Sequence, residues 1–274
     1  MYGAMIGDII GSIYEFDNLK KKQFPLFGEG VFFTDDALCT VAVADALLTF
    51  HNPAECLRYW GAKYPDLGYG VKFRLWLQSS DMRPYNSWGN GAAMRVSPAG
   101  FLSSDVKHAM FLAEAVTVVT HNHPEGVKGA KATASAIRMA FDGYDPSSIR
   151  ARITADFAYD LSQTVDEIRS WYEYNESCQG TVPQALTCAL EATDYEDAIR
   201  NAISIGGDSD TVACIAGGLA EALFGLPQDI LDKGKSYLPE EMILVIEQMY
   251  SKGIHAKRMS FTSSRVVTPW ARCD

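Results

Sequence analysis

The sequence predicts an all-α fold that forms one domain. Apolar residues recur at helical spacing along most of the chain, alternating strand patterns are nearly absent, and no linker or fixed-period repeat interrupts the pattern. The 274 residues are enough to bury a substantial core, and 47% hydrophobic with 21% charged residues is an ordinary globular composition. We therefore expect a single compact domain over residues 1–274, with an irregular C-terminal tail at 258–274.

Glycines mark the first predicted helix, residues 1–15. Gly3, Gly7 and Gly11 recur every four residues and so form a stripe on one helix face. Each glycine costs a helix about 1 kcal/mol relative to alanine, so three on one stripe indicate the close approach of another backbone. The stripe ends at Glu15, which places an acid at the edge of that contact.

The other helices are predicted from the same periodicity. After a loop at 16–33, a strongly apolar helix over 32–48 has Thr34 or Asp35 as its N-cap. A further apolar helix runs from the acidic stretch at 205–212 to about residue 224. The remaining predicted helices are 53–64, 71–79, 92–97, 104–119, 125–141, 146–172, 180–192, 195–203, 227–233 and 239–251.

Charge and cysteine usage limit the classes of partner. The net charge is -10, and Lys20-Lys21-Lys22 is the only basic run, which argues against nucleic acid as the main partner. The six cysteines are scattered without C-x-x-C spacing, which argues against structural zinc and favours a reducing, cytoplasmic compartment. Neither a secretory leader nor a membrane-spanning run is recognisable. We expect a cytoplasmic monomer.

Two short stretches place paired acids and a threonine at the start of apolar helices. They are F-T-D-D at 33–36 and G-G-D-S-D-T-V at 206–212. In one interpretation each is a capped helix N-terminus matched to the helix dipole. In the other, the two stretches and the acid at position 15 form one cluster of hard oxygen ligands. The candidate ligands are Glu15, Thr34, Asp35, Asp36, Asp208, Asp210 and Thr211.

Such a cluster suits Mg²⁺, Mn²⁺ or Ca²⁺ rather than zinc or copper. Five carboxylates packed together would repel one another without cations between them, and they could hold two divalent ions, as in two-metal hydrolytic sites. An EF-hand is excluded, because Ala213 and Leu219 occupy the positions of its glycine and glutamate. The G-K-S at 234–236 lacks the first P-loop glycine, and neither G-x-S-x-G nor H-E-x-x-H occurs.

At this point the chain resembles a known family. The stretches G-D-I-I-G-S-I-Y-E, F-T-D-D, G-N-G-A-A-M-R, T-H-N-H-P-E-G and G-G-D-S-D-T-V occur in the order seen in ADP-ribosylglycohydrolases, the dinitrogenase-reductase-activating and ADP-ribosylarginine-hydrolase-like family. The resemblance covers residues 1 to about 226. It implies the compact orthogonal helical domain of that family and a centre of two Mg²⁺ or Mn²⁺ ions.

The resemblance assigns all seven candidate ligands to the metals. Glu15 matches the family's mobile glutamate, which reaches the metals or the substrate. One departure is Ala37, where the family usually has a further threonine after the two acids. That threonine is not one of the seven ligands, so the departure affects only local hydrogen bonding.

The G-N-G-A-A-M-R loop has two glycines around Asn90 just before a short helix. Backbone N–H groups exposed at such a turn can cradle anions, although a plain turn is the alternative. The resemblance implies that the loop binds the diphosphate and ribose of ADP-ribose. The candidate substrate-binding residues are Gly89, Asn90, Gly91, Ala92, Met94 and His121.

Other polar and aromatic residues near these motifs have open roles. Arg95 could pair with phosphate or with a structural acid. The resemblance puts His121 near the ribose or diphosphate, while His123 could equally be a hydrogen-bonded structural residue. We expect adenine to stack on an aromatic side chain. The candidates are Tyr69, Tyr85 and Trp88.

The expected function is metal-dependent hydrolysis of the glycosidic bond between ADP-ribose and an acceptor. The acceptor would be a protein side chain such as arginine, or part of a small-molecule conjugate. Asp36 or Glu15 would be the catalytic base or acid. The alternatives are a metal-dependent phosphoesterase acting on a nucleotide or an ADP-ribose derivative, and a non-catalytic module that binds ADP-ribose.

Overall fold

The structure is a computed structural model that describes residues 1–253. Within that range every regular element is a helix, α1 to α15, and the one β-type pairing is an isolated bridge between Gly89 and Ser177. The predicted all-α class is therefore confirmed. The tail predicted at 258–274 lies outside the described residues.

The helices occupy most of the described chain. Their bounds are α1 (Tyr2–Gly11), α2 (Asp35–Thr49), α3 (Pro53–Lys63), α4 (Val71–Gln78), α5 (Gly91–Met94), α6 (Ser97–Leu102), α7 (Val106–Thr117), α8 (Pro124–Phe141), α9 (Pro146–Phe157), α10 (Val165–Trp171), α11 (Cys178–Leu190), α12 (Tyr195–Ile205), α13 (Ser209–Phe224), α14 (Gln228–Lys235) and α15 (Glu240–Lys252). None of them combines the length and apolar character that crossing a membrane requires.

Three predicted helices differ from the observed ones. The predicted helix at 92–97 is the short α5, which ends at Met94, and the separate helix α6 over Ser97–Leu102 was not predicted. The first helix ends at Gly11 rather than residue 15, so Glu15 lies in the segment that follows α1. The predicted helix at 146–172 is two helices, because α9 ends at Ala158 in the left-handed region with φ 53°. A capping box between Thr164 and Glu167 then begins α10.

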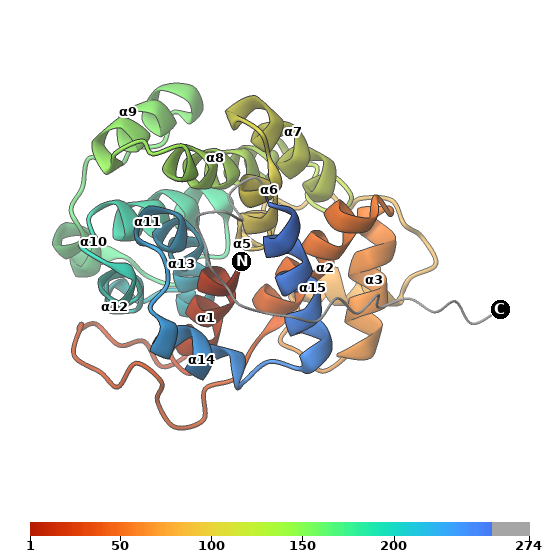
Figure 1. The fold of residues 1–274 in the computed structure, drawn as a ribbon, viewed down its shortest axis with the longest axis horizontal. Coiled ribbons are helices and arrows are strands. Elements are labelled where there is room, and N and C mark those ends of the chain that lie inside the picture. The colour runs from red at the N-terminus through yellow and green to blue at the C-terminus, as the bar shows by residue number, and fades with distance from the viewer. Residues whose placement is uncertain (254–274) are drawn as a thin grey trace.

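The centre of the fold is the antiparallel pair α1 and α13 (Figure 1). A Cβ atom on Gly3 would lie 2.5 Å from the carbonyl oxygen of Gly217, and one on Gly7 would lie 2.1 Å from that of Ala213. A Cβ atom on Gly11 would lie 2.4 Å from Cα of Asp210. The predicted backbone contact along the glycine stripe is confirmed.

This pairing positions the acids. Because the helices are antiparallel, the C-terminal end of α1 lies against the N-terminal turn of α13. The chain that leaves α1 toward Glu15 therefore starts beside Asp210. The other helices surround this pair, with α7, α8 and α9 along one side, α2, α3 and α15 along another, and α10 to α12 along a third (Figure 1).

Candidate metal centre and substrate cleft

Three carboxylates from distant parts of the chain converge at the centre of the fold. Asp208 is the N-cap residue of α13 and Asp210 lies in its first turn, and both are buried. Glu15, which is partly buried, approaches them from the segment after α1. One carboxylate oxygen of each residue lies within 4.8 Å of the others, so the three could hold a metal ion together.

The start of α2 brings the second group of acids. Thr34 caps the helix by accepting a hydrogen bond from the Asp36 N–H at 3.3 Å. Asp36 is buried, and its Oδ2 atom has no hydrogen-bond partner in residues 1–253. Asp35 is partly buried beside it. A buried carboxylate oxygen without a donor is costly, so an additional positive group is needed here.

The electrostatics of the cluster favour the binding of cations. Burial, followed by repulsion from Asp210, raises the pKa of Glu15 to about 8 and that of Asp35 to about 7. The same two causes raise the pKa values of Asp36 and Asp208 well above the usual range. Burial also raises the pKa of Asp210. These oxygen donors crowd together with like charges, an arrangement that fits divalent cations.

Asp8 is a further acid of this centre that sequence reasoning missed. It is fully buried on α1, and its Oδ1 atom accepts a hydrogen bond from the Thr34 hydroxyl at 2.5 Å. Its Oδ2 atom accepts from the N–H groups of Thr34 at 2.9 Å and Ala37 at 3.1 Å. Asp8 thus fixes the start of α2. A lone acid in an otherwise apolar, glycine-rich helix was the available signal.

The Ala37 departure has little effect on this hydrogen bonding. The N–H group of Ala37 bonds to Asp8 whatever side chain residue 37 carries. Thr211 is buried in the first turn of α13, and its N–H group donates to the Asp210 Oδ1 atom at 2.8 Å. The structure therefore brings the candidate ligands to two adjoining helix starts. Their coordination of metal stays a prediction.

The glycine loop before α5 is tied to the acids by Asn90. The Asn90 amide donates to Asp208 Oδ2 at 2.6 Å and to Thr181 Oγ1 at 3.2 Å. Its own N–H group donates to the carbonyl of Glu176 at 2.7 Å. The side chain of Asn90 therefore helps to orient a candidate metal ligand.

Most N–H groups of this loop already have protein partners. Gly89 donates to Ser87, and both Ala92 and Met94 donate within the turn itself. The Gly91 N–H group makes no hydrogen bond in the described part of the chain. The side chains of Ala92 and Met94 are buried in the core. Of the N–H groups predicted to bind an anion, the Gly91 N–H is therefore the one that remains available in the described structure.

His121 lies directly against this loop. A Cβ atom on Gly91 would be 3.2 Å from His121 Nε2, so a side chain there would crowd the imidazole. Burial, with the neighbouring Arg95 charge, holds the pKa of His121 well below its usual range, so the ring is neutral. The Thr120 hydroxyl contacts its Nδ1 atom at 2.8 Å, which leaves Nε2 facing the loop.

Arg95 is placed behind His121. Its guanidinium donates to Thr120 Oγ1 at 2.6 Å and lies 3.3 Å from His121 Nδ1. It is buried and forms no ion pair with an acid among residues 1–253, so its assignment to a structural acid is wrong. Arg95 orients His121 instead.

A sequence model of the family described as ADP-ribosylglycohydrolase matches residues 1–254. The chain belongs to the ADP-ribosylglycohydrolase family. A putative ADP-ribosyl glycohydrolase, L543, of Acanthamoeba polyphaga mimivirus is 28% identical over 279 residues, spanning 81% of this chain and 84% of that protein.

Two further relatives carry more specific names. The human ADP-ribosylhydrolase ARH3 is 24% identical over 306 residues, which cover 82% of this chain and 84% of the human protein. The ADP-ribosylarginine hydrolase Tri1 of Pseudomonas putida is 26% identical over 264 residues, which cover 82% of this chain and 70% of Tri1.

A solved structure shares the fold. It is titled ADP-ribosylglycohydrolase-related protein complex and superposes with a TM-score of 0.68 at 23% identity, covering 92% of this chain and 96% of that chain. The ADP-ribosylglycohydrolase fold predicted from the sequence motifs is therefore confirmed.

The three aromatic candidates occupy different environments. Tyr69 is buried, and its hydroxyl donates to the carbonyl of Tyr64. Trp88 is 46% exposed and packs edge-on against His123. The ring of Tyr85 lies 5.9 Å from that of His121. Tyr85 and Trp88 can therefore reach a ligand, while Tyr69 is committed to the core.

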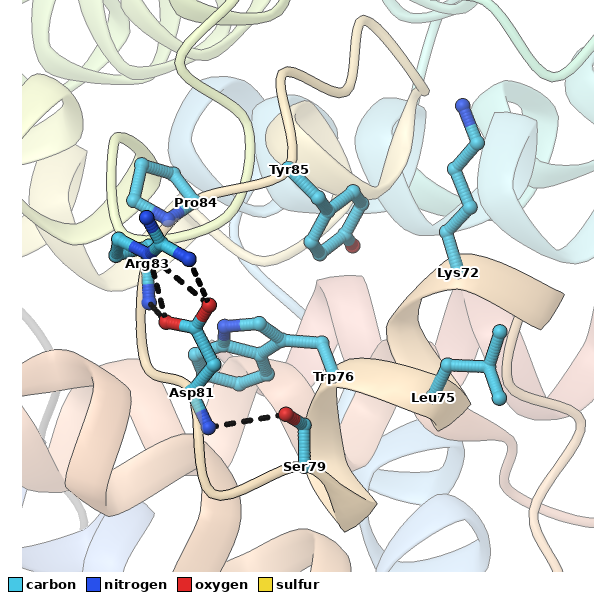
Figure 2. Close-up of a pocket in the computed structure, with 8 residues that line it drawn as sticks. All are labelled: Lys72, Leu75, Trp76, Ser79, Asp81, Arg83, Pro84 and Tyr85. Atoms are coloured by element: carbon cyan, nitrogen blue, oxygen red, sulfur yellow. Dashed lines mark hydrogen bonds and ion pairs between the residues drawn. The ribbon is translucent and has the colours of Figure 1, made fainter.

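Beyond Tyr85 the structure has a pocket of about 440 Å³. Figure 2 shows Trp76 in its middle, with the Asp81–Arg83 ion pair on one side and Tyr85, Lys72 and Leu75 on the other. Trp76 is 5% exposed, and its indole Nε1 has no hydrogen-bond partner within the described residues. The lining residues are Lys72, Leu75, Trp76, Ser79, Asp81, Arg83, Pro84 and Tyr85.

Proposed function

We propose that this protein is a metal-dependent hydrolase that cleaves the glycosidic bond between ADP-ribose and an acceptor. The observation that carries the proposal is the convergence of Glu15, Asp208 and Asp210 within 4.8 Å, beside a buried Asp36 whose Oδ2 atom has no hydrogen-bond partner in residues 1–253. Membership of the ADP-ribosylglycohydrolase family supports the substrate class. The acceptor is a protein side chain such as arginine, the residue named for the relative Tri1, or part of a small-molecule conjugate.

The residues at the two helix starts fit two Mg²⁺ or Mn²⁺ ions. Their donors are all oxygen atoms, and five of the seven residues are acids. We assign Thr34, Asp35 and Asp36 at α2, Asp208, Asp210 and Thr211 at α13, and Glu15 between them. Bound divalent ions supply Lewis acidity, which stabilises negative charge on a substrate oxygen.

Glu15 is the best-placed acid or base. It is partly buried, whereas Asp36 is almost completely buried, so Glu15 can exchange protons with solvent and reach a leaving group. In the metal-free protein, burial and repulsion from Asp210 raise the pKa of Glu15 to about 8, and bound cations would lower it again. Glu15 would protonate the departing acceptor atom and then accept a proton from water. Asp36 is the alternative group for the second step.

The remaining site residues would orient ADP-ribose. Anionic side chains close to the scissile carbon favour the positive charge that this carbon gains as the bond breaks. The diphosphate would lie at the glycine loop, next to the Gly91 N–H group and the neutral His121 ring. Adenine would extend past Tyr85 into the pocket, where a shift of the Trp76 ring would let its buried N–H, unpartnered within residues 1–253, donate to a ring nitrogen.

The proposed compartment follows from the thiols, and the proposed monomer follows from the origin of the site residues. Five cysteines, Cys39, Cys56, Cys178, Cys188 and Cys214, are free and buried, which supports a reducing compartment such as the cytoplasm. All proposed catalytic groups come from this one chain, so we propose that a monomer suffices.

The test is the release of ADP-ribose from two substrates. An arginine-ADP-ribosylated protein and a serine-ADP-ribosylated peptide are incubated with Mg²⁺, with EDTA, and with the Asp210→Asn variant, and products are identified by mass spectrometry. We expect intact ADP-ribose only with metal, and a loss of at least about 100-fold in kcat for Asp210→Asn, the scale for removing a charge-stabilising group.

A matched control is Asp66→Asn, because Asp66 is exposed and makes no hydrogen bond or ion pair within residues 1–253. It should keep wild-type activity. Release of phosphate in place of ADP-ribose would identify a phosphoesterase. Tight binding of ADP-ribose without turnover of either substrate would identify a binding module.

A further inference from the structure

Asn18 joins the two ligand-bearing segments of the candidate metal centre. Its Oδ1 atom accepts a hydrogen bond from the Gly207 N–H at 2.7 Å, and its Nδ2 atom donates to the Gly207 carbonyl at 2.9 Å. Gly207 directly precedes Asp208. One side chain therefore satisfies both polar groups of the residue next to a candidate ligand.

The same amide holds the Glu15 segment. The Nδ2 atom also donates to the carbonyl of Tyr14 at 2.7 Å and to that of Glu15 at 3.1 Å. An amide NH₂ has two hydrogens and here meets three carbonyls, so one hydrogen is shared. Reversing the amide would set its NH₂ against the Gly207 N–H and its oxygen against three carbonyls, so the neighbours define its orientation.

The loop that carries Asp208 is shaped to receive this side chain. Gly206 and Gly207 have φ values of 71° and 81°, in the left-handed region that favours glycine. A Cβ atom on Gly206 would lie 2.9 Å from Asn18 Oδ1, so a side chain there would displace the amide. Lys20 supports the same loop by donating to the carbonyls of Tyr172 and Ile205.

We propose that Asn18 is a positioning residue that sets the place of Glu15 relative to Asp208 and Asp210. The inference rests on the proposed function, since it concerns the acid–base group of that site. Asn18 lies three residues after Glu15 and contacts the residue before Asp208, so it links both ends of the gap that a metal ion and a substrate would occupy. It acts through Glu15 and touches neither substrate nor metal.

The experiment is a double-mutant cycle between Asn18→Ala and Glu15→Gln. With Glu15 present, Asn18→Ala should lower kcat about 10- to 100-fold, which is the usual loss when a group that orients a metal ligand is removed. KM should change by less than about 3-fold. In the Glu15→Gln background the same change should cost less than about 3-fold, because the group that Asn18 positions is already lost. Equal losses in both backgrounds would overturn the proposal.

The control for general loosening is Asn52→Ala. Asn52 caps α3 through a hydrogen bond from the Ala54 N–H, so its loss lowers stability without touching the centre. The kcat values of Asn18→Ala and Asn52→Ala are measured at temperatures that lie equally far below the melting temperature of each variant. A fall in kcat for both variants alike would contradict positioning by Asn18.

Two readouts are independent of turnover. In Asn18→Ala the Gly207 amide should exchange its hydrogen faster, and Mn²⁺ titrated into the protein should bind about 10-fold more weakly. If wild-type protein releases no ADP-ribose, the proposed function fails, while the Mn²⁺ affinities still decide the role of Asn18. Unchanged Mn²⁺ affinity in Asn18→Ala would overturn that role.

Discussion

Trp76 has a buried indole Nε1 atom that has no hydrogen-bond partner among residues 1–253. The indole of Trp60 offers a contrast, because its Nε1 atom donates to Asp45 at 2.9 Å. A buried donor without an acceptor costs free energy unless a ligand completes it. Trp76→Phe keeps most of the packing and removes the donor. We expect KM for an ADP-ribosylated substrate to rise about 2- to 10-fold, with kcat nearly unchanged, as for one lost hydrogen bond.

Trp60→Phe is the matched variant for this prediction. It removes an indole donor that is already bonded, so it should lower the melting temperature and leave KM at the wild-type value. Steady-state kinetics and a thermal melt on both variants separate the two effects. A higher melting temperature for Trp76→Phe with an unchanged KM would show that the pocket does not bind adenine through this nitrogen.

Sequence reasoning reached some residues of the centre and missed others for a physical reason. Asp36, Asp208 and Asp210 stood out because paired acids at the start of an apolar helix exceed what capping needs. Asp8 and Asn18 did not stand out, because their roles exist only through contacts with chain segments far away in sequence. Asp8 carried only the signal of a lone acid in an apolar helix, and no local pattern marks Asn18 as different from an ordinary turn residue.

At the scale of elements, the glycine stripe of α1 makes a sharp prediction. A Cβ atom on Gly7 would lie 2.1 Å from the Ala213 carbonyl oxygen, so Gly7→Ala must push α1 and α13 apart. The gain of about 1 kcal/mol in helix propensity cannot offset that strain. We expect a net loss of about 2 kcal/mol or more in the free energy of unfolding, measured by denaturant titration.

Gly68→Ala serves as the comparison. A Cβ atom there would meet nothing within 4 Å of it, so the free energy of unfolding should change by less than about 0.5 kcal/mol. If the two variants had the same free energy of unfolding, the prediction of a close backbone contact between α1 and α13 at Gly7 would be wrong.

Helix positions were largely predictable, while two helix ends were not. The periodicity of apolar residues identified the region of each long helix, because burial of one face sets that period. The break between α9 and α10 was missed although Thr164 and Glu167 carry the sequence pattern of a capping box. The early end of α1 at Gly11 was missed because the next residue, Ser12, still has helical dihedral angles and no glycine or proline follows directly to mark a stop.

For the whole molecule, the acidic centre links stability to pH. Glu15 and Asp35 have pKa values of about 8 and about 7, raised by burial and by Asp210, so the folded protein holds protons that the unfolded chain has released. The free energy of unfolding of the metal-free protein therefore falls as the pH rises from about 4 to about 8. Its melting temperature should be lower at pH 8 than at pH 5.5.

Divalent cations should reverse this effect. At 100 times its dissociation constant, a ligand of the folded state adds about 2.7 kcal/mol, or about 5 to 10 °C in melting temperature. We expect a gain of this size with Mg²⁺ or Mn²⁺ at pH 8, and a smaller gain at pH 5.5, where protons compete. KCl at equal ionic strength is the control. If the metal-free protein were more stable at pH 8 than at pH 5.5, the raised pKa values of the clustered carboxylates would be contradicted.

The pairing of α1 with α13 also sets the order in which the protein can be made. During synthesis α1 leaves the ribosome before α13, whose contacting residues are about 200 positions later, and Asn18 is separated from Gly207 by 189 positions. Closing so long a loop is slow and cannot start until its distant end has emerged. A nascent chain that stops before residue 206 therefore contains Glu15, Asp35 and Asp36 but lacks the second half of the centre. The two halves of the centre can therefore meet only after α13 has been synthesised.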